Sequence, residues 1–204
     1  MATKDAIVRA AMRLFAQQGY ARTSIAQIEK TVGLRPGSGG LYRHFASKEA
    51  ILEAGIASAL SASDEARAAV DRLPRDDQRG ALKLVAKASL RLLDRDRDLT
   101  AILFKDLDQF PSLRDEVRER WIQSSYDTMA AILRHTGSAS GDYEAHAAVA
   151  LGSLVLYHVL QVVLGEPPGR ISERRFLAAW LDRFAPAKSG GRSNSTRRKA
   201  LSRR

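Results

Sequence analysis

The chain has 204 residues, which is enough for one or two domains with a sizeable hydrophobic core. It contains no cysteine, which excludes disulfide bonds and thiolate metal sites and fits a reducing compartment. The formal net charge of +10 comes from the two ends of the chain. Residues 1–50 carry eight Lys/Arg and three Asp/Glu, and residues 187–204 carry seven Lys/Arg and no Asp/Glu. Residues 51–186 between them carry 18 Lys/Arg and 20 Asp/Glu, so this part is nearly neutral. Basic ends of this kind are suited to contact with phosphate groups.

The sequence gives no sign of export or of membrane insertion. Charged residues interrupt the N-terminal stretch MATKDAIVRAAMRLF, so it lacks the apolar centre of a signal peptide. No uninterrupted apolar run approaches the roughly 18 residues of a membrane span. We therefore expect a cytoplasmic protein without membrane contact.

The first predicted helix covers about residues 4–18, with Ile7, Ala11, Leu14 and Phe15 on one face, and ends at Gly19. A second predicted helix begins at Ser24-Ile25-Ala26-Gln27, where the serine hydroxyl and the glutamine side chain can cap each other's backbone donors. Ile25, Ile28 and Val32 line one face of this helix, and Gly33 ends it.

A short helix is also predicted after the loop Leu34-Arg35-Pro36-Gly37, with Leu41 and Phe45 facing inward and Tyr42, Arg43 and His44 nearer the surface. Two short helices around a glycine turn are typical of a helix-turn-helix that enters a DNA major groove. The pattern therefore predicts a DNA-binding segment.

The remaining predicted elements are also helices, so the fold class is all-α. One begins at Ser47 and continues towards Leu73, and the others cover about residues 77–94, 97–109, 112–134, 142–164 and 172–184. In the helix at 142–164 the apolar surface extends more than halfway around. Such a helix must be buried on two sides, either by its own chain alone or partly by another chain.

The segments LFAQQGYARTSIAQI and GLYRHFASKEAIL resemble the DNA-binding domain of the tetracycline-repressor (TetR) family of bacterial transcription regulators. The resemblance covers about 50 N-terminal residues. It implies a helix-turn-helix domain at 1–50 and a helical effector-binding and dimerisation domain at 51–186, followed here by a basic tail at 187–204 that we expect to be disordered. It also implies a homodimer formed through the helices at about 142–164 and 172–184. One departure is a longer Pro/Gly-rich loop between Gly33 and Leu41, which leaves open where the recognition helix starts.

Candidate DNA contacts follow from this segment. Thr23 and Ser24 can bind a phosphate or simply cap the helix, and Arg35, Ser38 and Arg43 can donate either to base edges or to phosphates. Gly39 and Gly40 allow close approach of the backbone to DNA. By resemblance, Tyr42 and His44 should lie at the DNA backbone or groove edge, and Lys48 should point at phosphate. The candidate set is Thr23, Ser24, Arg35, Ser38, Gly39, Gly40, Tyr42, Arg43, His44 and Lys48.

In the same way, the resemblance implies an effector cavity among the middle helices. Its candidate contacts are aromatic or flexible apolar residues, with ordinary core packing as the alternative role of each: Phe104, Phe110, Trp121, Tyr126 and Met129. Asp106, Gln123 and His135 could add polar contacts. Nothing in the sequence identifies the effector.

The predicted function is a sequence-specific transcriptional regulator, in particular a repressor that binds a palindromic operator as a homodimer and responds to a small molecule. The alternatives are an activator on the same fold, a nonspecific nucleoid-type DNA-binding protein, and a helical enzyme or carrier that binds no DNA. The four histidines lack metal-ligand spacing, and no phosphate loop of the Gly-Lys-Ser/Thr type follows the glycines. We expect no cofactor, no metal and no enzymatic activity.

Overall fold

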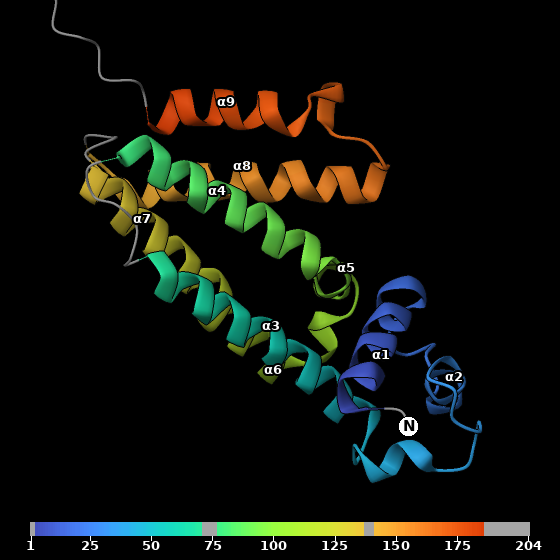
Figure 1. Ribbon diagram of the computed structural model, residues 1–204. Coiled ribbons are helices and arrows are strands. Elements are labelled where there is room, and N and C mark those ends of the chain that lie inside the picture. Colours follow the sequence, from blue (N-terminus) through green and yellow to red (C-terminus); the bar gives the residue numbers. More distant parts are fainter. Residues whose placement is uncertain (1–2, 71–76, 137–140, 186–204) are drawn as a thin grey trace, which may run out of the picture.

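The computed structural model describes residues 3–70, 77–136 and 141–185. Within these ranges the chain forms helices and no strand, so the predicted all-α fold is confirmed. Figure 1 shows two parts: α1 and α2 lie at one end of the molecule, and a larger group of long helices forms the rest. The predicted basic tail at 187–204 lies outside the described residues.

The N-terminal end contains α1 (Lys4–Gln18), α2 (Ile25–Thr31) and the 3-10 helix η1 (Gly40–Arg43). The predicted cap of α2 is confirmed: Gln27 N–H donates to Ser24 Oγ at 3.2 Å, and the Gln27 side chain accepts from Ser24 N–H at 2.7 Å. We call the unit of α1, α2 and η1 with the start of α3, residues 3–54, the reader.

The short helix predicted after the loop is a single 3-10 turn rather than an α-helix. Gly39 precedes it in the left-handed region at φ 69°, a conformation that glycine adopts without steric cost. Ser47 already caps α3 through a hydrogen bond from Ala50 N–H at 3.0 Å. Only a few residues remain between these two points, so the segment has no room for a longer helix.

The long helix α3 (Lys48–Val70) joins the reader to the body, as Figure 1 shows. The body continues with α4 (Gln78–Arg95), α5 (Arg97–Lys105), η2 (Leu107–Gln109), α6 (Pro111–Glu116), η3 (Val117–Gln123) and α7 (Ser124–Thr136). We expected one helix over 112–134. The structure instead places seven residues of π-helix, η3, between α6 and α7, and π-helical turns often mark functional positions.

The last elements are α8 (Tyr143–Leu164), η4 (Pro168–Arg170) and α9 (Glu173–Phe184). By length and composition α8 could cross a membrane, since an 18-residue window has a mean hydropathy of 2.0, although polar residues interrupt the apolar run. One such helix is weak evidence for a span, because core helices of soluble proteins meet the same criteria.

Two hydrophobic clusters stabilise the fold. One joins α4, α7, α8 and α9, and Trp180 of α9 donates from Nε1 to the Ala150 carbonyl at 3.0 Å within it. The other joins α1, α2, η1 and α3 with Leu99 and Ile102 of α5 and Val117 of η3. The core of the reader is therefore continuous with α5 and η3 of the body.

Candidate functional site

The 3-10 turn η1 presents its polar side chains outward. Leu41 is fully buried, whereas Tyr42 next to it is 57% exposed and Arg43 is also exposed. His44 and Phe45 are half-buried. The buried leucine fixes the turn on the core of the reader, and the two side chains that follow it are available to a partner.

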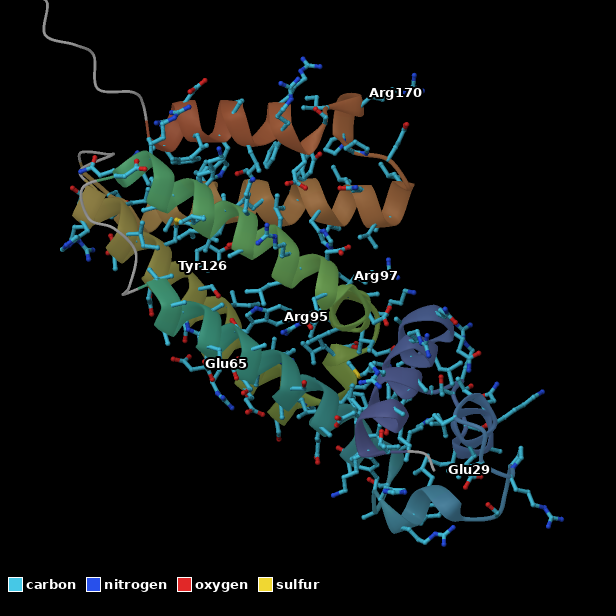
Figure 2. The ribbon with its side chains drawn as sticks, viewed as in Figure 1. Glu29, Glu65, Arg95, Arg97, Tyr126 and Arg170 are labelled. Carbon is cyan, nitrogen blue, oxygen red and sulfur yellow. The ribbon has the colours of Figure 1, made fainter. Side chains whose placement is uncertain are left out.

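The carboxylate of Glu29, labelled in Figure 2, holds the loop that leads into this turn. Glu29 is fully buried, and its two oxygens accept hydrogen bonds from Gly37 N–H at 2.7 Å and from Leu41 N–H at 3.2 Å. Hydrogen bonds from backbone donors to a charged acceptor are among the stronger ones in proteins. Glu29 thus holds the middle and the C-terminal end of the Pro/Gly-rich loop.

Sequence reasoning did not identify Glu29 as a functional residue. A signal was present, because Ile25, Ile28, Glu29 and Val32 occupy positions i, i+3, i+4 and i+7 of one helical face. A carboxylate on such a face must find donors when it is buried. Which donors it finds could not be read from the pattern.

The remaining loop candidates divide into exposed donors and turn-forming residues. Arg35 and Ser38 are exposed, and Ser38 Oγ accepts from Gly40 N–H at 3.4 Å. Gly40 is buried and Gly39 supplies the left-handed turn. Arg35, Ser38 and Arg43 are thus all exposed in this segment, and the glycines shape the backbone between them.

Lys48, the candidate phosphate ligand, lies in the gap between α3 and the segment that joins α1 to α2. Its Nζ donates to the carbonyls of Tyr20 and Thr23, both at 2.8 Å, and lies 4.1 Å from the centroid of the Tyr20 ring. Burial lowers the pKa of Lys48, and the nearby Asp106 carboxylate partly opposes this shift. Through these contacts Lys48 positions the segment that leads into α2.

Thr23 and Ser24 have different surroundings. Thr23 is buried, and its hydroxyl donates to the Gly19 carbonyl at 2.9 Å. Ser24 is exposed, and its hydroxyl takes part in the cap of α2. Of the two, only Ser24 faces solvent.

An apolar cavity of about 520 Å³ lies in the body. Three of the five candidate effector contacts line it, namely Phe104, Trp121 and Tyr126, the last labelled between α3 and α4 in Figure 2. Met129 is buried beside a smaller adjoining space. Phe110 instead packs edge-on against the Tyr20 ring at 4.7 Å and is absent from the cavity wall.

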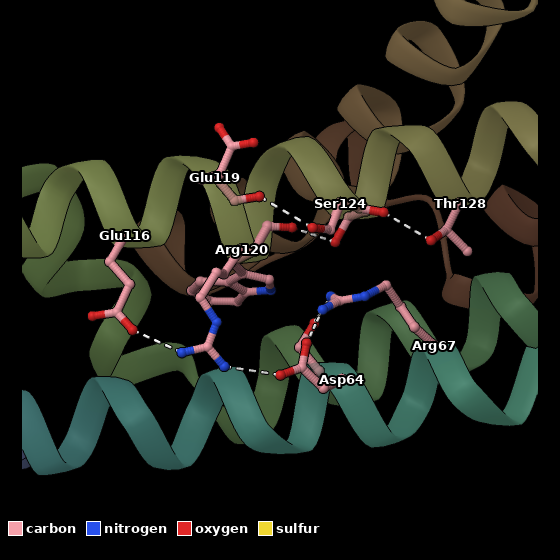
Figure 3. Close-up of polar contacts among 10 residues, drawn as sticks. Asp64, Arg67, Glu116, Glu119, Arg120, Ser124 and Thr128 are labelled. Carbon is pink, nitrogen blue, oxygen red and sulfur yellow. Dashed lines mark hydrogen bonds and ion pairs between the residues drawn. The ribbon is translucent and has the colours of Figure 1, made fainter.

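The π-helix η3 forms part of this cavity and is tied to α3. Val117, Trp121 and Ile122 of η3 line the cavity. Arg120 of η3 pairs with Glu116 of α6 at 2.7 Å and with Asp64 of α3 at 3.0 Å, and Arg67 also pairs with Asp64. Figure 3 shows these contacts. These charges are partly exposed, so the network orients η3 against α3 more than it stabilises the fold.

One face of α5 lines the cavity, and the end of the helix contacts the reader. Leu103 and Phe104 lie in the cavity wall. The next two residues bond to the reader: Lys105 Nζ donates to the Ala16 carbonyl at 2.7 Å, and Asp106 Oδ2 accepts from Tyr20 N–H at 3.0 Å. Asp106, considered as a ligand contact from the sequence, is buried in this junction.

The remaining polar candidates lie elsewhere. Gln123 is exposed and donates to Asp127 at 2.9 Å, and His135 is exposed. Within the described ranges, no group of three or more His, Asp or Glu side chains has an arrangement that could hold a metal ion.

Residues 7–54 match the family model "Bacterial regulatory proteins, tetR family". The chain is also 36% identical over 97 residues to the HTH-type transcriptional regulator TcmR of Streptomyces glaucescens. That alignment spans 47% of this chain and 39% of TcmR, well under half of the relative's length.

The whole fold is similar to solved structures of low sequence identity. A TetR-family transcriptional regulator from Agrobacterium tumefaciens has a TM-score of 0.68 at 17% identity, with 89% of this chain and 96% of that chain covered. The transcriptional regulator FadR from Bacillus subtilis, in complex with stearoyl-CoA, has a TM-score of 0.64 at 18% identity. The comparison covers 91% of this chain and 100% of the FadR chain. Residues 7–54 are thus similar to the tetR family of bacterial regulatory proteins, and the rest of the chain shares a fold with solved regulators.

Proposed function

We propose that this protein is a sequence-specific DNA-binding transcriptional regulator that acts as a homodimer, represses from a palindromic operator and releases it when a small molecule binds. The observation that carries the proposal is the η1 turn, where buried Leu41 and Glu29 hold the exposed side chains of Tyr42 and Arg43 at the surface. An arginine and a tyrosine on a rigid turn can reach base edges and phosphates. We place the DNA-binding domain at residues 1–50 and the effector and dimer domain at 51–186.

Within this proposal the reader residues have separate roles. Arg43, Arg35 and Ser38 donate to bases or phosphates, and Tyr42 and His44 lie against the DNA backbone. Ser24 is exposed and can bind a phosphate, whereas buried Thr23 supports the segment before α2. Lys48 contributes by positioning that segment, because two of its three donors already bond to carbonyls. Gly39 and Gly40 let the backbone turn close to the DNA.

The exposed apolar surface of α8 supports the homodimer. Val149, Leu156 and Val163 are 63%, 57% and 70% exposed and recur every seven residues, so they form one stripe. A continuous exposed apolar stripe marks an interaction surface. A second copy of α8 would cover it, with α9 at the side, and a dimer of this kind would place two readers on two half-sites.

The apolar cavity supports response to a small molecule. Its volume of about 520 Å³ and its aromatic wall suit a mainly apolar ligand. FadR, which has a similar fold, holds stearoyl-CoA in its solved complex. Because α5 contacts both the cavity and the reader, a ligand that prefers one position of α5 changes the spacing of the two readers. Such a ligand must bind the two states with different affinity.

Two alternatives use the same surface. A nucleoid-type protein would bind DNA through its charge without a preferred sequence, and an activator would bind the same kind of operator with the opposite outcome. The match of residues 7–54 to regulatory proteins favours a regulator, and we place its action in the cytoplasm. We do not propose an enzyme, because the match is to regulatory proteins.

The experiment is selection of bound duplexes from a random library by the purified full chain. Arg43→Ala and Tyr42→Phe are tested alongside, with Lys83→Ala as control, because Lys83 is exposed on α4 in the body. We expect a palindromic consensus for the wild type and the control. Affinity for the selected site should exceed that for random DNA by about a thousandfold or more.

Arg43→Ala should relax the consensus at one position in each half-site, since a bidentate contact discriminates by about 1–3 kcal/mol. Enrichment of no sequence, or equal binding of selected and random duplexes, would contradict the proposal and favour the nucleoid alternative. Reporter transcription from the selected site then separates repression from activation.

A further inference from the structure

A second cavity, of about 600 Å³, lies where α4 and α8 meet the first residues of α5 and α9. It shares no wall residue with the apolar cavity of the body. Its charged wall residues are Lys87, Arg91 and Asp94 of α4, Arg97 of α5 and Glu173 of α9. Arg97 is labelled in Figure 2 at the passage from α4 to α5. The cationic groups therefore outnumber the anionic ones by one.

His158 of α8 belongs to the same wall and is only 6% exposed. Its Nε2 is a buried side-chain atom without a hydrogen-bond partner, and no other such atom occurs in the described ranges. A buried polar atom without a partner costs free energy, so an unexplained one indicates a missing partner. Because His158 lines a cavity, a molecule in that cavity can supply the partner.

We propose that this cavity binds a small oxyanion, carried as a phosphate or carboxylate group, through Lys87, Arg91, Arg97 and Nε2 of His158. Guanidinium and ammonium groups are the usual donors to such anions. Asp94 and Glu173 reduce the positive charge of the wall, which favours a compact anion placed against the cationic side. The site is independent of DNA binding and of the apolar cavity.

The surroundings of His158 predict coupling between anion binding and protonation. Burial lowers the pKa of His158 and Arg97 lowers it further, while Asp94 and a hydrogen bond to the Leu93 backbone oppose the shift. The other titratable groups in the wall are Lys87, Arg91, Tyr157 and Glu173. A bound anion adds negative charge and favours the imidazolium, whose Nε2–H then donates to it. Anion binding should therefore be accompanied by proton uptake.

The test follows the imidazole signals of the full chain by NMR, with His158→Gln identifying the His158 signal. Inorganic phosphate is titrated in one arm and acetate in the other, at constant pH and at ionic strength held with sodium chloride. We expect a saturable shift of the His158 signal in at least one arm. A pH titration of that signal at saturating anion should then give a higher pKa of His158 than a pH titration without the anion. A shift with phosphate but not acetate, or with acetate but not phosphate, identifies which oxyanion the cavity binds.

Arg91→Met should weaken binding about tenfold, because a charged hydrogen bond is lost, whereas Lys83→Met on the same helix should leave it unchanged. Arg97→Gln provides a second variant if Arg91→Met fails to fold, as judged by circular dichroism. No saturable shift in either arm would overturn the proposal, and so would an equal shift with sodium chloride alone. Wild-type affinity in both arginine variants would overturn it as well. No DNA is present, so these outcomes leave the regulator proposal untouched.

Discussion

The carboxylate of Glu29 accepts a hydrogen bond from the backbone N–H of Leu41, twelve residues further along the chain, at 3.2 Å. This bond, with that from Gly37 N–H at 2.7 Å, ties the end of α2 to the exposed η1 turn. The loop is rich in glycine, and glycine loses more backbone entropy on ordering than other residues. The buried carboxylate offsets part of that cost and so gives the reader a fixed surface.

Glu29→Gln should disrupt the loop, because one carboxylate oxygen becomes an NH₂ group that faces a backbone donor. We expect the unfolding free energy to fall by about 1–3 kcal/mol. Operator affinity should fall as well, with faster hydrogen exchange at Gly37 and Leu41. Glu65→Gln, an exposed position of α3, is the matched control. Equal behaviour of the two variants would show that the buried carboxylate does not order the loop.

Lys48→Met separates a positioning role from a phosphate contact. Since Nζ donates to the carbonyls of Tyr20 and Thr23, we expect a loss of about 1–3 kcal/mol of unfolding free energy. The salt dependence of operator affinity should keep its slope. A slope reduced by about 1, with stability unchanged, would instead identify a phosphate ligand. Lys83→Met serves as the control.

Asp106→Asn should loosen the junction between body and reader. Asp106 accepts from Tyr20 N–H through Oδ2 and from Gln109 Nε2 through Oδ1, both at 3.0 Å, and an asparagine can accept through only one oxygen. We expect faster hydrogen exchange at Tyr20 and weaker operator binding. Asp108→Asn is the control, because Asp108 is exposed in η2. If both variants bind the operator like the wild type, the hydrogen bond from Tyr20 N–H to Asp106 has no role in operator binding.

Leu156→Glu places a charge in the centre of the exposed stripe on α8. We expect the homodimer to dissociate to monomers, measured by light scattering after size-exclusion chromatography, and operator affinity to fall because the two half-sites are no longer bound together. Lys83→Glu introduces the same side chain outside the stripe. A Leu156→Glu protein that remains dimeric would place the dimer interface elsewhere.

Acidification should destabilise the protein through His158. Its pKa is lowered in the folded protein from the ordinary 6.5, so below that pH the unfolded chain takes up a proton that the folded chain does not. The unfolding free energy therefore declines as the pH falls from about 6.5 towards the folded pKa and is constant above this range. Denaturant titrations at several pH values should show a shallower decline for His158→Gln than for wild type and for the exposed-site control His135→Gln.

The sequence by itself determined the all-α class, the capped α2 and the similarity of the reader to the tetR family, because helix periodicity, capping and the motif around Tyr42 are local signals. The boundaries of α1, α4, α8 and α9 agree with prediction to within a residue or so. The tertiary structure decided the rest. It placed Lys48 on the carbonyls of Tyr20 and Thr23 and turned Phe110 out of the cavity towards Tyr20.

Buried polar residues show the physical reason for this division. Glu29, Asp106 and His158 acquire their roles from partners or surroundings that distant parts of the chain supply. Asp106, for example, bonds to Tyr20, 86 residues earlier in the chain. Local periodicity indicates which face of a helix is buried, but only the packing of the helices brings a given donor to a given carboxylate.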